Sequence, residues 1–440
     1  MLTIKTDIQN QAWLRYILDE FICINLATFD IRIQNVTDSN SENVLYYTRN
    51  ILSHSHASIY CSNSPNPGVH TVWLFDNLFV FPETMTQENF FLNYDLFWNA
   101  FVFLSRLEEY QADLRGIKIT SYCSRHPRLD KSTFLIPIVN VLFNELAALI
   151  KQYFPELKFH EKRKPFVQCS HDVDYINKTF QLRIKHAVFH GYQSLKTIVQ
   201  PKVCWRNIKK TVRFLVTNPS YWCFDYWAVL EKEHNIRSVF YIYAKSGERR
   251  FKAWLIDPSY EVSTNERLKN KLKELLNDGF EIGLHGSYFS AVEEGLLKKE
   301  KQILESVLNH KIKKTRQHWL NYDEKITPYL HESLFQDDST LGWNDQMGFR
   351  SGCASQYRPF DHDNQRPFVY LETPQIMMDS HIFDYACDKN EAEKQAYELL
   401  SKLSVFKASY VSISWHQRVF SDDYQWHKVY EHILRKLHDI

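Results

Sequence analysis

Glycine is scarce in this chain, with 11 residues among 440. So few glycines exclude a Gly-rich linker, a collagen-like repeat and a set of phosphate-cradling glycine loops. Neither G-x-G-x-x-G nor G-x-x-x-x-G-K-[ST] occurs anywhere in the sequence. The common glycine-dependent nucleotide-binding motifs are therefore absent.

The sequence also lacks an excess of one charge and a cysteine pair motif, and we expect no leader segment. The 53 Lys and Arg residues balance 52 Asp and Glu residues, which argues against general binding to nucleic acid. The eight cysteines form no C-x-x-C, and the first residues contain no apolar run of signal-peptide length. We therefore expect reduced thiols and a cytoplasmic protein.

Hydrophobic residues make up 44% of the chain, which is typical of soluble globular proteins, and the length allows two or three domains. A charged, proline-bounded stretch over 154–165 predicts a linker. We therefore expect a smaller N-terminal α+β domain over 1–160 and a second domain over 161–440. The long apolar stretch 134–154 contains polar residues, so it predicts a buried helix about 138–153 rather than a membrane span.

The second domain alternates predicted strands with predicted helices. Strand-like runs lie at 166–170, 237–244, 280–284, 313–319 and 410–415, and helical patterns lie at 224–234, 264–277 and 291–309. The last helix is preceded by a predicted capping box, Ser290 with Glu293. This alternation predicts βα units around a largely parallel sheet or barrel, in which polar residues at the carboxyl ends of strands build the active site.

Three polar clusters follow predicted strands. They contain Asp172 and Asp174, then His285, then His416. Taken singly, a D-x-D is also compatible with a turn of solvated acids, and a lone strand-end histidine with a structural role. Together they favour a metal hydrolase, because imidazole and carboxylate ligands suit Zn²⁺ and similar ions.

The order of these clusters resembles the polysaccharide deacetylases of the NodB-homology type, carbohydrate esterase family four, over about 165–440. Ser170-His171-Asp172-Val173-Asp174 resembles the first motif, His285-Gly286-Ser287-Tyr288-Phe289 the second, Thr315-Arg316-Gln317-His318-Trp319 the third and Val411–His416 the last. The resemblance implies a distorted (β/α) barrel and a divalent metal, with Zn²⁺ the expected ion.

The resemblance also implies roles for individual residues. Asp172 would be the catalytic base, Arg316 would orient it, and His416 would be the general acid. Asp174 and His285 would bind the metal. Phe289 stands where the family has a second histidine ligand, and His318 is the candidate replacement. We further expect four substrate-binding residues, namely Arg350, Trp415, Ser287 and Asp379.

Parts of the remaining chain resemble a bacterial branch of this family. The segment 97–110, with its LSRLEEY, resembles an N-terminal domain of unknown function, and 333–352 and 372–380 resemble the same branch. Asp338, Arg350 and Asp379 would line the site or orient His416, with structural roles as the alternative.

The function that the resemblance implies is removal of N-acetyl groups from a sugar or glycan precursor in bacterial surface-polysaccharide metabolism. The substrate would be an N-acetylated sugar, free or linked to a nucleotide or a lipid. Two alternatives stay open: a degenerate, non-catalytic protein that binds glycans or acts as a scaffold, and an amide hydrolase with a non-sugar substrate.

One segment departs from the even charge balance. Residues 176–224 contain nine Lys and Arg residues and no Asp or Glu, with apolar residues between them. This pattern predicts a basic amphipathic face for phosphate groups or for peripheral contact with an anionic membrane. A solvated helical insertion is the alternative, and no nucleic-acid partner is expected.

Overall fold

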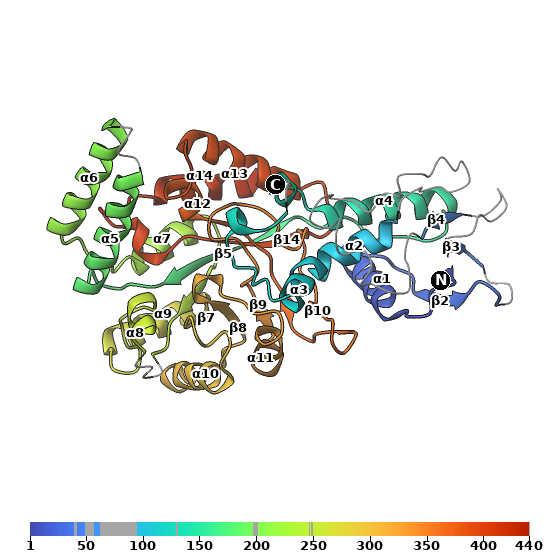
Figure 1. Cartoon of the computed structure of the whole chain (residues 1–440), viewed down its shortest axis with the longest axis horizontal. Helices are drawn as coiled ribbons and strands as arrows, with labels where there is room; N and C mark the ends of the chain where they lie inside the picture. Colours follow the sequence, from blue (N-terminus) through green and yellow to red (C-terminus); the bar gives the residue numbers. More distant parts are fainter. Residues whose placement is uncertain are drawn as a thin grey trace.

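A computed structural model describes residues 1–38, 42–48, 57–61, 95–128, 131–196, 201–245, 247 and 250–439 (Figure 1). The described residues form two parallel sheets with helices packed against them. Each sheet and its helices enclose a separate hydrophobic core. The α/β class and the parallel, barrel-like sheet predicted from the sequence are confirmed.

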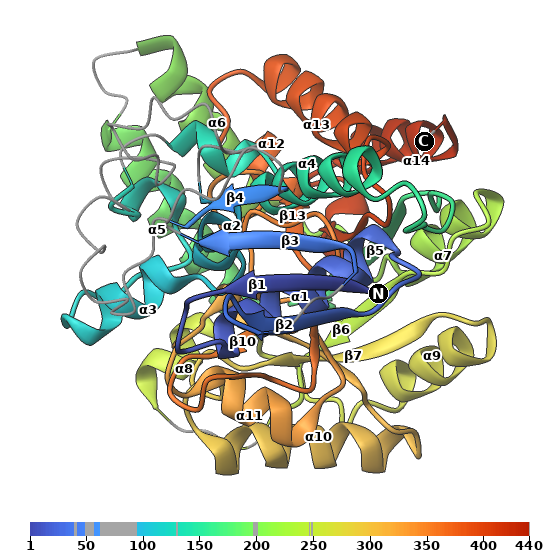
Figure 2. The same cartoon turned by 90° about the vertical axis from the view of Figure 1, so that its right-hand side faces the viewer.

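The N-terminal part is built on a four-stranded parallel sheet in the order β2-β1-β3-β4 (Figure 2). The central strand β1 is buried at all five positions, as expected for a parallel strand covered on both faces. Its strands are β1 (Leu2–Thr6), β2 (Ile31–Asn35), β3 (Val44–Thr48) and β4 (Ser58–Tyr60). Its helices are α1 (Ala12–Asn25), α2 (Leu96–Leu104), α3 (Leu107–Leu114) and α4 (Ile138–Tyr153).

The C-terminal part is built on an eight-stranded sheet in which every neighbouring pair is parallel. In spatial order its strands are β12 (Leu371–Glu372), β9 (Asp337–Asp338), β8 (Lys314–Gln317), β7 (Glu281–Gly286), β6 (Val239–Ile242), β5 (Phe166–Val173), β14 (Tyr410–Ser414) and β13 (Gln375–Met378). Because parallel strands end at one edge, this order brings the three predicted polar clusters together.

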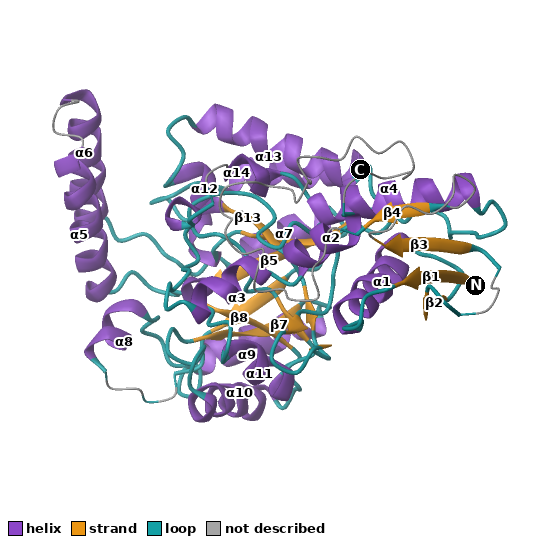
Figure 3. Ribbon diagram, turned by 45° about the vertical axis from the view of Figure 1, so that its right-hand side comes forward, coloured by secondary structure: helices purple, strands orange, loops and turns teal. Residues whose placement is uncertain are grey.

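Helices lie around the outside of this sheet (Figures 1 and 3). They are α7 (Phe224–Glu233), α8 (Phe251–Ile256), α9 (Glu266–Asn277), α10 (Glu294–Leu308), α11 (Thr327–Leu334), α12 (Asp379–Phe383), α13 (Lys389–Leu403) and α14 (His427–Asp439). A short hairpin of β10 (Phe360–Asp361) and β11 (Arg366–Pro367) lies outside both sheets. The predicted helices correspond to α4, α7, α9 and α10.

The predicted capping box is wrong. Helix α10 begins at Glu294 with Glu293 as its N-cap, so it starts three residues later than the sequence predicts. Ser290 instead donates a hydrogen bond from Oγ to the carbonyl of Ser287 at 2.9 Å. The hydroxyl therefore closes a turn beside the metal cluster described below rather than capping the helix.

The two parts share side chains. Cys353, Tyr357 and Phe360 belong to the N-terminal hydrophobic core, although they lie far along the chain. The expected linker also packs, since Leu157 is buried and Phe159 pairs with Ala27. The boundary at residue 160 and the kinship of the N-terminal part stay predictions.

Between β5 and α7 the chain forms two helices, α5 (Phe180–Lys196) and α6 (Pro201–Val216). They pack on each other and project from the side of the barrel in Figures 1 and 3. They carry most of the basic segment 176–224, of which residues 197–200 lie outside the described part. Among the described residues, no helix combines the length and the apolarity needed to cross a bilayer.

Candidate metal centre

Three side chains converge at the carboxyl edge of the eight-stranded sheet. Asp174, His285 and His318 are buried, and one ligand atom from each lies within 4.8 Å of the others. The Nε2 atoms of His285 and His318 lie 3.4 Å and 3.7 Å from Oδ1 of Asp174. Asp174 directly follows β5, His285 lies in β7, and His318 follows β8. Three strands therefore position this cluster.

The Nδ1 atom of each histidine has a partner that can only accept a hydrogen bond. His285 Nδ1 lies 3.0 Å from the carbonyl oxygen of Arg316, and His318 Nδ1 lies 3.0 Å from Asp257 Oδ1. Each Nδ1 therefore carries the proton when the ring is neutral, and each Nε2 presents a lone pair toward Asp174. Metal-binding histidines are oriented in this way by carbonyls and carboxylates.

The two oxygens of Asp174 differ in their surroundings. Oδ2 accepts a hydrogen bond from Arg418 Nη1 at 2.6 Å. Oδ1 is buried and accepts no hydrogen bond from the part of the chain that the structure describes. Burial raises the pKa of Asp174, but Arg418 and His416 outweigh it and hold the pKa well below its usual range. The carboxylate is therefore ionised and keeps one oxygen free.

An unpaired carboxylate oxygen facing two imidazole lone pairs fits a divalent cation. Without a cation these acceptors face one another, and burial makes an unsatisfied acceptor costly. One oxygen and two nitrogens are a common donor set for Zn²⁺ and leave positions open for water or substrate. The residues present therefore fit the metal that the sequence resemblance implies.

Phe289 does not belong to this cluster. Its ring is half-buried, and the guanidinium of Arg250 lies 4.0 Å from its centroid. His318 supplies the second imidazole from a tight turn, in which the next residue, Trp319, has a left-handed φ of 59°. Gly286, after His285, allows close packing, because a Cβ there would overlap the side chain of Gln317.

Asp172 lies beside the cluster and is held by Arg316. Arg316 is fully buried inside the barrel, and its Nη1 donates to Asp172 Oδ1 at 2.7 Å. The other guanidinium contacts are to Ser170, Ser339, Gln375 and Ser412. Burial raises the pKa of Asp172, but Arg316 and two histidines lower it by more, so the pKa is below its usual value. The carboxylate is therefore ionised. Asp172 can therefore accept a proton.

His416 lies on the other side of Asp174 and is held by Asp379. Its Nδ1 donates to Asp379 Oδ1 at 2.9 Å, and its backbone N–H donates to Oδ2 at 2.8 Å. Its Nε2 lies 3.5 Å from Asp174 Oδ2. Burial lowers the pKa of His416, but Asp379 and Asp174 raise it to about 9. His416 is therefore protonated at neutral pH and can donate a proton.

Two of the expected substrate ligands, Arg350 and Trp415, have contacts within the protein. Arg350 is buried, and its Nη2 donates to Glu109 Oε2 at 2.7 Å, so its guanidinium joins the two parts of the protein. Trp415 is fully buried, and its ring packs 5.2 Å from that of Tyr430. Arg350 therefore has a structural partner and Trp415 lies in the core, and a role of either side chain in binding substrate stays a prediction.

The remaining expected residues lie nearby with other contacts. Ser287 is buried, and its backbone N–H donates to Glu300 at 3.0 Å. Asp379 is buried and positions His416, which is the alternative noted for it from the sequence. Asp338 accepts a hydrogen bond from His331 and has a structural role.

Sequence reasoning missed two residues of this site. Arg418 lies two positions after His416 in a short 3₁₀ turn, and Asp257 is the residue that directly follows α8. The short spacing to His416 could have indicated Arg418. Asp257 lies 61 residues from His318 along the chain, and no local pattern connects them.

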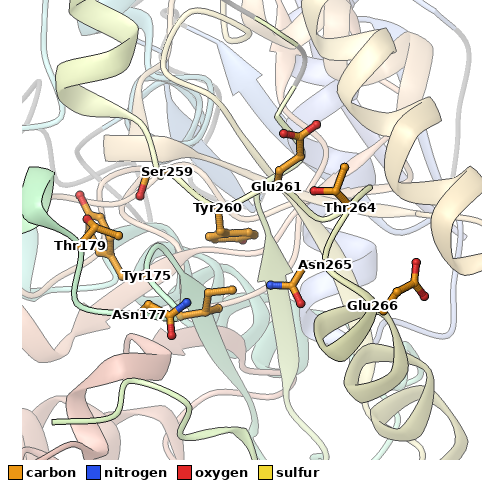
Figure 4. Close-up of a pocket in the computed structure, with 10 residues that line it drawn as sticks. Tyr175, Asn177, Thr179, Ser259, Tyr260, Glu261, Thr264, Asn265 and Glu266 are labelled. Atoms are coloured by element: carbon orange, nitrogen blue, oxygen red, sulfur yellow. The ribbon is translucent and has the colours of Figure 1, made fainter. Parts of the chain in front are cut away.

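A cavity of about 500 Å³ opens next to the segments that carry Asp174 and Asp257 (Figure 4). The ring of Tyr260 lies among polar side chains, and its hydroxyl is fixed between the Tyr243 N–H and the Val173 carbonyl. The lining residues are Tyr175, Ile176, Asn177, Thr179, Ser259, Tyr260, Glu261, Thr264, Asn265 and Glu266. An aromatic ring among amide and hydroxyl groups is a lining suited to polar ligands.

No protein family matches the chain, and no curated protein matches it. Solved structures do show similarity. One is a putative polysaccharide deacetylase from Mycobacterium smegmatis, with 13% identity, a TM-score of 0.37, and coverage of 64% of this chain and 86% of that chain. Another is a polysaccharide deacetylase from Bacillus cereus, with 10% identity, a TM-score of 0.30, and coverage of 63% and 88%. A third is a CE4 family pseudoenzyme from Bacillus anthracis, with 9% identity, a TM-score of 0.29, and coverage of 64% and 62%.

Proposed function

We propose that the protein is a metal-dependent amide hydrolase that removes N-acetyl groups from a sugar or glycan precursor. The observation that carries this proposal is the convergence of Asp174, His285 and His318, with one free carboxylate oxygen and two oriented imidazoles. A divalent cation, for which Zn²⁺ is our expectation, would polarise the amide carbonyl and acidify a water molecule.

The side chains around the cluster have the protonation states that amide hydrolysis needs. Asp172 is ionised and held by Arg316, so it can take the proton of the attacking water. His416 is protonated and held by Asp379, so it can protonate the leaving amine, which is too basic to depart as an anion. The products would be acetate and an amino sugar.

The choice of a sugar rests on the sequence resemblance, and the cavity beside the site supports it. Its amide, hydroxyl and carboxylate side chains can pair with sugar hydroxyls, and Tyr260 offers a ring. A nucleotide-linked or lipid-linked N-acetyl sugar is the substrate class that we propose. A non-sugar amide stays the alternative within the same chemistry.

A non-catalytic glycan-binding protein is the second candidate, and one observation favours it. Arg418 places a fixed positive charge 2.6 Å from Asp174 Oδ2, on the carboxylate whose other oxygen would bind the metal. A guanidinium can substitute for a cation in neutralising a buried carboxylate. Metal content therefore distinguishes the two candidates.

The test is metal analysis of the purified protein, coupled to acetate release from free, nucleotide-linked and lipid-linked N-acetyl sugars. We expect about one equivalent of metal in the wild type and its loss in His285→Ala and His318→Ala. Asp172→Asn should keep the metal and lose acetate release. His310→Ala is the matched control, because His310 is exposed on the surface.

A protein that holds no metal and releases no acetate would overturn the hydrolase in favour of the glycan-binding candidate. Unchanged acetate release in His285→Ala would overturn the assignment of the metal ligands. Hydrolysis of a non-sugar amide, without acetate release from any of the N-acetyl sugars, would keep the assignment as a hydrolase and change the proposed substrate class.

A further inference from the structure

The apolar side chains of α6 face outward. Trp205, Ile208, Val212 and Leu215 follow one another at intervals of three and four residues, and all are exposed. Trp205 is 59% exposed and Val212 is 54% exposed. A surface helix of a soluble protein normally turns such a stripe toward the core. Only Phe214, on the opposite side, is buried among the described residues of this helix.

Helix α5 repeats this arrangement. Phe180, Ile184 and Val188 are spaced four residues apart and therefore lie on one face, and Phe180 is 76% exposed. The inner side of the pair packs through Leu182 and Phe214 against Tyr221. The pair α5 and α6, called the hairpin below, is thus anchored by one side and leaves an apolar stripe on each helix without cover from the described residues.

Helix α8 adds a third apolar element beside the start of α5. Phe251, Trp254 and Leu255 are exposed, and Gln181 of α5 donates a hydrogen bond to the carbonyl of Trp254. Lys185 of α5 donates to the carbonyl of Ile256 at 3.1 Å. These bonds hold α8 beside the start of α5 (Figure 3). Exposed apolar side chains therefore occur on three helices at this end of the molecule.

The segment that carries the stripes of α5 and α6 has charge of one sign. Residues 176–224 carry nine Lys and Arg residues and no Asp or Glu. Lys209 and Arg213 are exposed beside the α6 stripe, and the Lys209 Nζ lies 5.5 Å from the Trp205 ring. The side chains of Lys196, Lys202, Arg206 and Lys210 lie outside the described part. This segment combines exposed apolar side chains with cations and has no acids. It therefore complements a partner with an apolar interior and an anionic surface.

We propose that α5, α6 and α8 form a peripheral membrane-binding surface for bilayers with anionic headgroups. The Val, Ile and Trp side chains enter the headgroup boundary, and Lys and Arg contact lipid phosphates. A second copy of this chain fits less well, because it would bring two acid-free hairpins face to face. A nucleic acid fits less well, because exposed aliphatic residues offer nothing to a phosphate backbone.

This surface adjoins the candidate metal centre. Lys185 of α5 donates to the hydroxyl of Tyr175 at 2.9 Å and to the carbonyl of Asp257 at 3.3 Å. Tyr175 follows the metal ligand Asp174, and Asp257 orients His318. A bilayer bound to the hairpin would therefore lie on the side of the barrel from which these two segments extend.

The experiment is co-sedimentation of the full chain with vesicles of phosphatidylcholine alone or mixed with phosphatidylglycerol, at low and high salt. We expect binding to the mixed vesicles that weakens as salt rises. Lys209→Glu with Arg213→Glu, and Trp205→Ser with Val212→Ser, should each weaken binding about tenfold or more. All four positions are on the outer face, so thermal melting should show folded proteins.

The controls are Lys298→Glu with Lys299→Glu on α10 and Val369→Ser, which change exposed residues elsewhere. They should bind like the wild type. No binding to mixed vesicles at low salt would overturn the proposal, as would equal binding by the hairpin variants. Self-association in ultracentrifugation that Trp205→Ser with Val212→Ser abolishes, without vesicle binding, would assign the surface to a second copy instead.

Discussion

Asp257 Oδ1 lies 3.0 Å from His318 Nδ1, and this contact fixes which nitrogen of His318 faces Asp174. The same carboxylate oxygen accepts the backbone N–H of Tyr288 at 2.8 Å, near His285. One acid therefore connects the segments that carry both histidines. In many metal sites a carboxylate accepts the second ring N–H of a metal-binding histidine and so orients the ring, and Asp257 has this position relative to His318.

We expect Asp257→Ala to weaken metal binding about 10–100-fold, because His318 loses its fixed tautomer and orientation. Titration calorimetry with Zn²⁺ on the metal-stripped protein measures this affinity. Asp30→Ala, an exposed aspartate of the N-terminal part, is the control and should match the wild type. An unchanged affinity in Asp257→Ala would remove this residue from the site.

Arg350 joins the two parts of the molecule through a buried ion pair with Glu109, which Arg106 also contacts at 3.3 Å. Burial raises the pKa of Glu109, but Arg350 and Arg106 outweigh it and hold it below its usual range. We expect Arg350→Ala to destabilise the protein by roughly 3 kcal/mol, because the buried carboxylate of Glu109 loses one of its two arginine partners. Urea unfolding measures this loss.

The double variant Glu109→Gln with Arg350→Met separates a lost ion pair from lost packing. It should recover much of the stability, since no buried charge is then left unpaired. A double variant as unstable as Arg350→Ala would show that packing dominates. Acetate release by folded Arg350→Ala should match that of the wild type. If Arg350 bound the substrate, acetate release would fall.

Glu300 gives a pH dependence of stability. It is fully buried, and burial raises its pKa from 4.5 to about 8, despite hydrogen bonds from Ser287 and Ser290 that lower it. The folded state therefore binds a proton that the unfolded state releases above pH 4.5. Stability contributed by the neutral form is present below that pH and is lost as the pH rises toward about 8.

We expect Glu300→Gln to lose less thermal stability than the wild type between pH 5 and pH 8, by roughly 2 °C or more in Tm. The neutral amide keeps an acceptor for the Ser287 N–H and has no proton to release. Glu294→Gln on the same helix is the control, because Glu294 is exposed. Parallel Tm curves for wild type and Glu300→Gln would contradict the raised pKa.

The fold class could be predicted because strand and helix patterns alternate from residue 166 onward, and such alternation has few solutions. Asp174, His285 and His416 could be placed together because each ends or follows a parallel strand. His318 follows from the same rule once Phe289 leaves a ligand missing. These predictions depend only on local patterns and on the shared edge of a parallel sheet.

Local patterns do not predict the roles of Asp257 and Arg418 or the partner of Arg350. Asp257 lies on a loop, and the contact between Glu109 and Arg350 joins residues 241 positions apart. From the sequence alone Arg350 resembles a substrate ligand, because its buried partner Glu109 cannot be identified there. Contacts between distant loops and helices follow from packing, which no spacing rule encodes.

Cys353, Tyr357 and Phe360 pack with the first core although the sequence places them in the second part. A chain that began after the apparent linker would carry these side chains into water and leave Arg350 without its carboxylate. We therefore expect the barrel produced without the first part to be less stable than the full chain, because the two parts complete each other's packing and charge pairing.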